Sequence, residues 1–332
     1  MTGGLRQTMA VLLVAAVVGA PGPAHAYLKF GVEVGGQVVA VRWAPGPIRY
    51  FVTERDIAGV SAQAFADAVG RAAATWDALP DLPVTFSAQG FTRSQPLETD
   101  GRSTIGFLDR PEQERVLGAA TFLLDSATGT LLESDVYFNS RFQWSTAAGG
   151  EAGRVDLESV ALHELGHMLG LGHSAIGETE VSGNGRRVLS SGAVMFPIAM
   201  PAGAIADRVL QTDDIAGVLD LYGVTPADKG SVQGRVTKGG RGVYGAHVVA
   251  FNLQTREIIA GYALAEDGTF ALAGLSPGPH VLRVEPLDDA DVESFFTPAR
   301  VDIDFTVTFA STIVVVQGGG ATTDVSIEVR PR

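Results

Sequence analysis

The 332-residue sequence contains no cysteine, and its 24 lysine and arginine residues are outnumbered by 37 aspartate and glutamate residues. The absence of cysteine excludes disulfide bonds, thiolate zinc sites, iron–sulfur clusters and cysteine nucleophiles, so any metal ion must be held by His, Asp or Glu. The net charge of −13 argues against binding to nucleic acid or to anionic membranes, because phosphate groups would be repelled. A hydrophobic fraction of 46% is typical of a globular protein, and the length predicts two domains.

Long apolar runs are also missing. The apolar run at residues 9–20 is too short to span a bilayer as an ordinary helix. Arg6 precedes this run, and Ala-His-Ala at residues 24–26 follows it, which together predict a secretory signal peptide at residues 1–26. No later stretch is apolar enough to cross a membrane. We therefore expect a secreted protein, extracellular or periplasmic, without a membrane span.

The character of the chain changes near residue 225. Before this point, strand-like and helix-like segments alternate, and after it short alternating segments punctuated by glycine predict only strands, as in a β-sandwich. We therefore predict a first domain at residues 27–224, a linker at 225–229 and an all-β sandwich at 230–332. The elements predicted for the first domain are strands at 47–53, 84–87, 104–108, 117–125 and 131–139, a helix capped by Ser61, and helices at 156–170 and 212–222. The strands predicted for the second are 231–237, 243–251, 258–264, 270–272, 280–284, 301–309, 313–316 and 325–329.

Residues 163–173 carry most of the recognisable chemistry and read His-Glu-Leu-Gly-His-Met-Leu-Gly-Leu-Gly-His. On a helix, His163 and His167 lie one turn apart on one face, so both imidazoles can reach one ion. Gly170 can adopt a positive φ and turn the chain, which allows His173 to fold back as a third nitrogen ligand. Three protein ligands leave one position open for water, as is typical of a catalytic zinc site.

This pattern, His-Glu-x-x-His-x-x-Gly-x-x-His, resembles that of the metzincin zinc endopeptidases, and Ser174 after the third histidine resembles the matrixin branch. Met195, within Ala-Val-Met-Phe-Pro at 193–197, resembles the methionine of the matrixin Met-turn, which underlies the zinc ligands. Residues 213–223 resemble the matrixin C-terminal helix, and residues 134–139 resemble the segment before the active-site helix. The resemblance covers roughly residues 40–224. It implies an α+β catalytic domain, with a twisted, mostly parallel sheet and an active-site helix, that cleaves protein or peptide substrates.

The sequence departs from the matrixin pattern in ways that bear on its metals. Ala119 and Tyr137 stand where vertebrate matrixins have histidines for a second, structural zinc, so we expect one zinc ion. Asp135 matches a family calcium ligand and is a candidate calcium ligand here, although Asn139 replaces a neighbouring aspartate. No cysteine is present for the inhibitory propeptide switch of the family.

Two further departures concern the substrate. Residues 174–192 form a longer loop than in compact matrixins, and Ala199 stands where an aromatic residue often lines the substrate pocket. Both leave the substrate preference open. Residues 230–287 resemble the carboxypeptidase regulatory-like, transthyretin-like module; such modules stabilise, tether or bind a ligand, and the sequence does not decide among these roles.

The sequence thus predicts a zinc endopeptidase in which His163, His167 and His173 bind the metal and Glu164 is the general base. One alternative is a catalytically silent binding or adhesion protein derived from a metzincin, and another is a zinc hydrolase that acts on something other than peptides. The presence of Glu164 and of all three ligands argues against the catalytically silent alternative, and the Met-turn resemblance at Met195 argues against a hydrolase of other substrates. Because every candidate catalytic residue precedes Gly223, the first domain is expected to cleave short peptides without the second.

Overall fold

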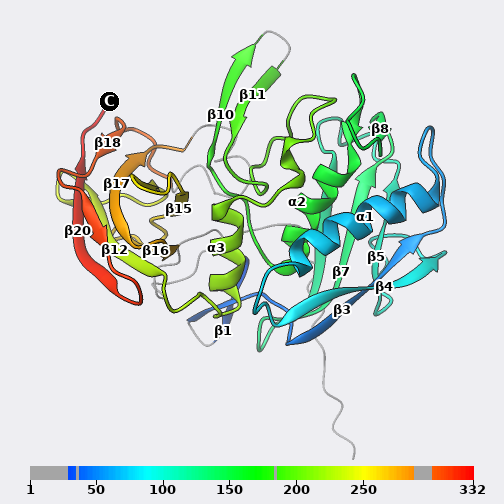
Figure 1. The fold of residues 1–332 in the computed structure, drawn as a ribbon, viewed down its shortest axis with the longest axis horizontal. Coiled ribbons are helices and arrows are strands. Elements are labelled where there is room, and N and C mark those ends of the chain that lie inside the picture. The colour runs from blue at the N-terminus through cyan, green and yellow to red at the C-terminus, as the bar shows by residue number, and fades with distance from the viewer. Residues whose placement is uncertain (1–28, 35–36, 183–184, 288–300) are drawn as a thin grey trace, which may run out of the picture.

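The computed structural model describes residues 29–34, 37–182, 185–287 and 301–332, so the signal peptide predicted at 1–26 lies outside the described residues. None of the helices in these ranges is both long enough and apolar enough to span a bilayer. The chain folds into an α/β half followed by a half built from strands (Figure 1).

The first half contains a five-stranded, mostly parallel sheet with the strand order β4-β3-β5-β7-β6. Neighbouring strands in this sheet run parallel except for β6, which is antiparallel to β7 and forms one edge. The predicted α+β class and the mostly parallel sheet are therefore confirmed for this half. The strands are β3 (Gly46–Thr53), β4 (Val84–Thr92), β5 (Ser103–Leu108), β6 (Gly118–Asp125) and β7 (Thr130–Asn139).

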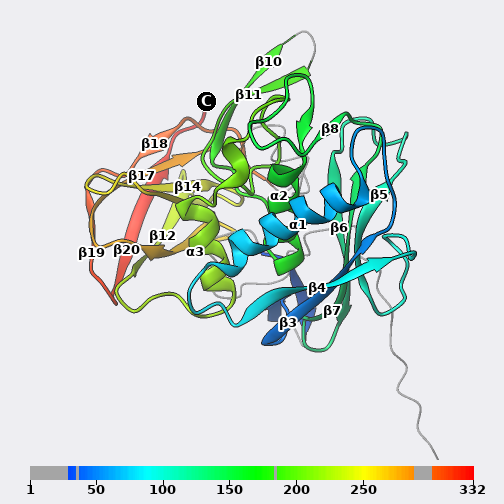
Figure 2. The same cartoon turned by 45° about the vertical axis from the view of Figure 1, so that its right-hand side comes forward.

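Two helices, α1 (Ala62–Asp77) and α2 (Leu157–Leu169), lie side by side on one face of this sheet (Figure 2). Ser61 caps α1 by accepting a hydrogen bond from the backbone N–H of Ala64 at 3.2 Å, as the sequence predicted. Trp76 on α1 is fully buried, and its indole N–H donates to the Leu162 carbonyl of α2 at 2.9 Å. This buried hydrogen bond connects the two helices within the core.

An aromatic cluster fills the space between these helices and the sheet. It joins α1, β5, β7 and the short strand β8 (Trp144–Ser145), with ring centroids 4.5 Å apart for Phe65–Phe107 and 5.6 Å apart for Phe138–Trp144. All four side chains are fully buried, and each contributes about 1.5–3 kcal/mol to stability by its burial. This cluster packs α1 against the sheet.

The remaining small elements of the first half are paired strands and two short helical segments. Residues 174–192, predicted as a loop, instead contain the antiparallel hairpin β10–β11, which projects from the molecule (Figure 1). The prediction was wrong because this segment lacks the alternation of apolar and polar residues that identifies a half-buried strand. These elements are β1 (Gly31–Val34), β2 (Gln37–Ala40), β9 (Val155–Asp156), β10 (Gly177–Ser182), β11 (Gly185–Ser191), the 3-10 helix η1 (Ala206–Arg208) and α3 (Thr212–Leu221).

The second half contains two sheets and, among its described residues, no helix. One sheet has the order β13-β12-β16, with β20 pairing parallel to β12, and the other has the order β15-β14-β17-β18, with β19 pairing to β17. Its core comprises fully buried side chains such as Val232, Phe270 and Leu282. The strands are β12 (Gly230–Lys238), β13 (Arg241–Gly242), β14 (His247–Asn252), β15 (Ile258–Tyr262), β16 (Thr269–Leu275), β17 (Gly278–Glu285), β18 (Thr308–Phe309), β19 (Val314–Val316) and β20 (Ala321–Val329).

One strand prediction in this half was wrong. Residues 301–309 were predicted as a strand, but only Thr308–Phe309 forms one. The backbone N–H groups of this stretch donate to different elements, with Asp302 donating to the Tyr244 carbonyl and Thr306 to the Arg330 carbonyl. A segment whose bonds go to several partners cannot form one continuous ladder.

Helix α3 joins the two halves. Figures 1 and 2 both show it between α2 and the strands of the second half, and it contacts β15 and β16. Ala216 on α3 belongs to the hydrophobic core of the second half, whereas Val218 and Leu221 belong to the core of the first. The two halves therefore share a packed helix.

Candidate metal centre and catalytic residues

The candidate metal centre is built on α2 and on the turn that follows it. Asp156 caps the helix by accepting the backbone N–H of Ser159 at 2.9 Å. Gly170 ends the helix with φ 106°, and a Cβ at this position would lie only 2.3 Å from the carbonyl oxygen of Val41. The sharp turn predicted at Gly170 is thus formed, and it sends the chain back beneath the helix.

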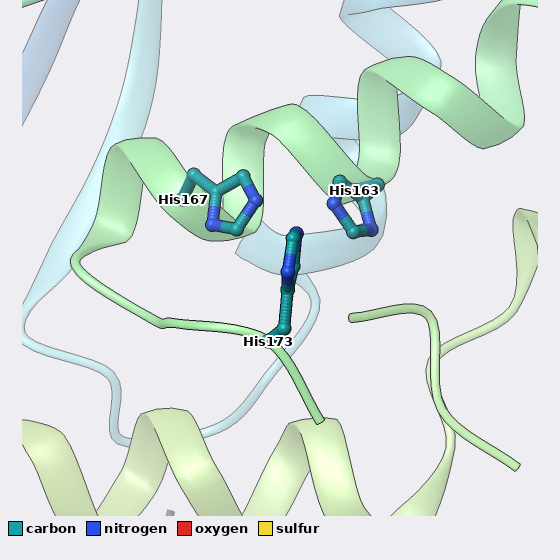
Figure 3. Close-up of side chains that lie close together, drawn as sticks. All are labelled: His163, His167 and His173. Atoms are coloured by element: carbon teal, nitrogen blue, oxygen red, sulfur yellow. The ribbon is translucent and has the colours of Figure 1, made fainter. Parts of the chain in front are cut away.

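The structure brings the three predicted histidines together. Their ring centroids are 4.7 Å (His163–His167), 4.8 Å (His167–His173) and 5.2 Å (His163–His173) apart. One candidate ligand atom from each residue lies within 4.8 Å of the other two, and this is the only such group of three or more His, Asp or Glu side chains in the described ranges. Figure 3 shows two rings projecting from the helix and His173 reaching them from the returning loop.

Backbone carbonyls orient the two histidines of the helix. His163 Nδ1 lies 2.7 Å from the carbonyl oxygen of Val194, and His167 Nδ1 lies 2.8 Å from that of Leu171. Because a carbonyl oxygen can only accept, both Nδ1 atoms carry the proton and both Nε2 lone pairs are left for a metal ion.

Burial also favours the neutral form of each ring. It lowers the pKa of all three histidines, that of His167 to about 3, and the neighbouring imidazoles lower the pKa of His167 and His173 further. The lowered pKa values keep the three imidazoles neutral, which is the form that binds a metal ion. Three neutral nitrogen donors on one ion are a donor set that fits zinc and leaves a coordination position for water.

Glu164 lies next to these ligands and is almost fully buried. Burial raises its pKa to about 8. Its Oε2 atom is buried and has no hydrogen-bond partner among the described residues. Its Oε1 atom faces the start of edge strand β6, where a Cβ on Gly118 would lie 3.0 Å away. A buried carboxylate oxygen without a partner is costly unless a polar group such as water meets it.

Met195 lies beneath the helix, and its position depends on a residue that the sequence did not single out. The Met195 side chain is buried, and a Cβ on Gly166 would lie 2.3 Å from its sulfur. The Asp214 carboxylate accepts hydrogen bonds from the backbone N–H groups of Val194 at 2.9 Å and Met195 at 3.0 Å. Glycine at 166 thus allows the close approach, and Asp214 holds the turn in place.

Asp135, the candidate calcium ligand, does not belong to the histidine cluster, and its carboxylate is hydrogen-bonded to the backbone. Its two carboxylate oxygens accept the backbone N–H groups of Leu97 at 2.6 Å and Thr104 at 2.7 Å. Burial raises its pKa to about 7, although these hydrogen bonds act in the opposite direction. Asp135 belongs to no group of three or more candidate ligands in the described ranges, although the nearby carboxylates of Glu133 and Asp100 also raise its pKa. Calcium binding at Asp135 therefore stays a prediction.

Ala119 and Tyr137, which stand at the family's second zinc site, and Asn139, which replaces a family aspartate, have contacts within the protein. Ala119 and Tyr137 are opposite each other in the β6–β7 ladder. The Tyr137 hydroxyl donates to the side-chain oxygen of Gln113, and the Asn139 amide donates to the carbonyl oxygens of Arg110 and Gln113. These contacts hold the segment that leads into β6.

Two clustered histidines on a helix under a mostly parallel sheet, with a third on the returning loop, form the arrangement that defines the metzincin class of metallopeptidases. The sequence model of the matrixin family, Peptidase_M10, matches residues 42–223, and the chain belongs to this family. Matrixins are zinc metalloendopeptidases, and the histidine cluster fits their catalytic zinc. The match ends before the second half begins, so the transthyretin-like resemblance of that half stays a prediction.

Individual relatives come from plants and animals. Metalloendoproteinase 1-MMP of Arabidopsis thaliana is 38% identical over 111 residues, which are 31% of this chain and 26% of that protein. Metalloendoproteinase 2-MMP of the same plant is 32% identical over 159 residues, 44% of this chain and 35% of that protein. Matrilysin of Rattus norvegicus is 36% identical over 97 residues, 29% of this chain and 30% of that protein. The chain thus matches these relatives over little more than a third of their length at most.

Proposed function

We propose that this protein is a secreted zinc endopeptidase that cleaves protein or peptide substrates, with Glu164 as its general base. The observation that carries the proposal is the juxtaposition of three neutral imidazoles with a buried carboxylate whose Oε2 atom has no partner in the described residues. His163, His167 and His173 would hold the zinc ion. The family membership of residues 42–223 supports the same assignment.

Zinc, when bound, lowers the pKa of a coordinated water to about 7 and polarises the scissile carbonyl. Burial alone raises the pKa of Glu164 to about 8, and a zinc ion held by the three imidazoles would lower it again and favour the carboxylate. In that form Glu164 accepts the proton of the attacking water and passes it to the leaving amine. The three imidazoles stay neutral throughout, because burial lowers their pKa values. Met195 contributes packing beneath the ligands and does not bind the metal.

Strand β6 offers a place for the substrate. It forms the edge of the sheet and, within the described part of the chain, pairs with β7 alone. An extended peptide can add to such an edge through backbone hydrogen bonds, which provide affinity without fixing side-chain preference. Gly118 at the start of β6 faces Glu164, so a peptide bound there would lie beside the proposed base.

The metal content belongs to the same proposal: one zinc ion per chain, with calcium at Asp135 if a second metal binds. The proposal also includes residues 1–26 as a signal peptide, a catalytic domain at 27–224, a linker at 225–229 and a carboxypeptidase regulatory-like sandwich at 230–332. Oxygen ligands such as the Asp135 carboxylate favour calcium over zinc.

The test is a Glu164→Gln variant of the mature chain, incubated with a diverse peptide library whose cleavage sites are mapped by mass spectrometry. The parent is expected to cleave, and a chelator is expected to abolish cleavage. The variant is expected to lose about 10²–10⁴-fold in kcat/KM, because that is the usual contribution of general base catalysis. Elemental analysis should find one zinc ion in both proteins, since Glu164 is not a ligand.

Two further variants complete this experiment. Glu158→Gln is the matched control, because Glu158 lies on the same helix and pairs with Arg71 rather than with the histidines; its activity should equal that of the parent. His167→Ala should lose the zinc. Full cleavage by Glu164→Gln would contradict the role of Glu164, and zinc binding without cleavage in the parent would favour the catalytically silent alternative.

A further inference from the structure

The second half of the molecule touches the loop that carries the third histidine. The Tyr262 hydroxyl, on β15, donates a hydrogen bond to the backbone carbonyl oxygen of His173 at 3.3 Å, across 89 residues of sequence. The Tyr262 side chain is buried between the halves, in a small apolar cluster with Ala175 and Tyr244. A ligand of the proposed zinc site is therefore in direct contact with the sandwich.

A second contact connects the same strand to the next residue of the loop. The Asp213 carboxylate, on α3, accepts the Ser174 hydroxyl at 2.7 Å and the backbone N–H of Ala260 at 2.8 Å. β15 is an edge strand, so a backbone N–H that points away from β14 needs a partner outside the sheet. Asp213 supplies this partner and joins β15 to the residue after His173.

The contact region is tightly packed. A cavity of only about 20 Å³ remains between the loop and β15, lined by His173, Asp213 and Tyr262 among others. Tyr262 is held from its own side as well, because its ring lies 5.4 Å from that of His247, which in turn pairs with Glu285 at 3.0 Å. The Tyr262 side chain is therefore contacted both by the loop and by a neighbouring strand of its own sheet.

These contacts matter because the three ligands are supported unequally. His163 and His167 are fixed by one regular helix, whereas His173 lies on an irregular turn after Gly170. A metal site requires each ligand to be held within about 0.5 Å of its productive position. Residues that orient ligands usually contribute about 10–100-fold to metal affinity.

We propose that the sandwich is part of the support of the metal centre, with Tyr262 as a positioning residue for His173. The proposal rests on the zinc site proposed above and assigns the second half a role that the sequence leaves open. Tyr262 is assigned no direct role in binding substrate or metal; it acts through the backbone of His173. Asp213 reinforces this effect through Ser174.

The experiment compares the full mature chain with a Tyr262→Phe variant, which removes only the hydroxyl. Zinc affinity is measured by competition with a chromophoric chelator, and the stability of the metal-free proteins is measured by urea unfolding. The variant should bind zinc about tenfold more weakly, which is the lower end of the range for residues that orient ligands. The stability of its metal-free form should be close to that of the parent. In peptide cleavage at saturating zinc, kcat should fall while KM stays the same.

Tyr244→Phe is the matched control, because it is the same change at a tyrosine of the same apolar cluster. It should leave zinc affinity unchanged. Equal zinc affinities of the parent and Tyr262→Phe would overturn the positioning role while leaving the proposed zinc site intact. Equal weakening in both variants, together with a loss of metal-free stability, would also overturn it, in favour of general packing. A parent that holds no zinc would refute the proposed function itself.

Discussion

At the scale of single residues, Gly170 is required for two separate physical reasons. Its φ of 106° lies in a region that residues with side chains rarely adopt, and a Cβ would lie 2.3 Å from a backbone oxygen of Val41. Gly223 meets only the first condition. Its φ is 70°, but among the described residues no atom beyond its own residue and its chain neighbours lies within 4 Å of where its Cβ would be. The two glycines follow α2 and α3 in similar positions and can be compared directly.

We therefore predict different costs for the same substitution at these two positions. Gly223→Ala should lower the free energy of unfolding by about 1–2 kcal/mol, the strain of a left-handed backbone. Gly170→Ala should lower it by about 2–5 kcal/mol, because a steric overlap with backbone is added. Urea unfolding of the metal-free proteins measures both values. Equal losses would show that the turn after α2 can shift without cost.

Some residues of the candidate site and its surroundings can be predicted from the sequence, and others cannot. The three histidines, Glu164 and Gly170 lie within eleven consecutive residues. Helical spacing brings His163 and His167 together, and the turn at Gly170 returns His173 to them. Asp214 and Tyr262 have no such local signal, because their partners lie 20 and 89 residues away. Two adjacent aspartates at a helix start also match the ordinary preference for acidic residues there, which hides their contacts with Met195 and Ala260.

At the scale of elements, an ion pair ties the short helix η1 to the start of α2. Arg208 Nε donates to the Asp156 carboxylate at 2.9 Å, and its other nitrogens donate to the carbonyl oxygens of Ala147 and Ala148. Asp156 is also the cap of α2. Burial raises the pKa of Asp156, but the hydrogen bonds from Arg208 and Ser159 outweigh it and hold the pKa below its usual value.

Because the pKa of Asp156 is lowered in the folded state, the stabilisation by the Asp156–Arg208 ion pair depends on pH in a known direction. Its stabilisation is present above the unfolded pKa of about 3.9 and is lost as the pH falls through the folded pKa. Arg208→Gln should therefore lower the free energy of unfolding by about 2–4 kcal/mol at pH 7, because a buried carboxylate is left unpaired. The difference from the parent should shrink as the pH approaches 3.

Urea unfolding at pH 7, 5 and 3.5 measures this trend. The matched control is Arg141→Gln, since Arg141 pairs with Asp109 on the surface, where both side chains are more than half exposed. Such a pair contributes about 0–1 kcal/mol. A constant effect of Arg208→Gln across this pH range would contradict the assignment of the stabilisation to the Asp156 carboxylate.

A helix or strand can be predicted from the sequence where its apolar residues follow one periodic pattern. The buried face of α1 and the strands of the central sheet follow from local apolar spacing. The β10–β11 hairpin does not, because its strands lack the alternation of apolar and polar residues. The broken segment at 301–309 does not either, because its conformation depends on partners distant in sequence. In the latter, the fully buried Phe305 anchors a stretch whose backbone bonds go to residues 244 and 330.

At the scale of the whole molecule, the contacts argue against two independent halves. The sequence favours a first domain that functions alone, since all candidate catalytic residues precede Gly223. The structure nevertheless places Ala216 of α3 in the core of the second half and joins Asp213 to Ala260. A helix that belongs to two cores should make their unfolding cooperative.

All three tryptophans, Trp43, Trp76 and Trp144, precede residue 225, so their fluorescence reports on the first half alone. Leu282 is fully buried in the core of the second half, and Leu282→Ala should cost about 2–5 kcal/mol there. If the halves unfold together, the urea midpoint followed by tryptophan fluorescence should fall by the same amount as the midpoint followed by circular dichroism. Leu253→Ala is the matched control, because Leu253 is 45% exposed, and neither midpoint should move. An unchanged fluorescence midpoint in Leu282→Ala would mean that the first half unfolds on its own and would contradict the cooperative coupling through α3.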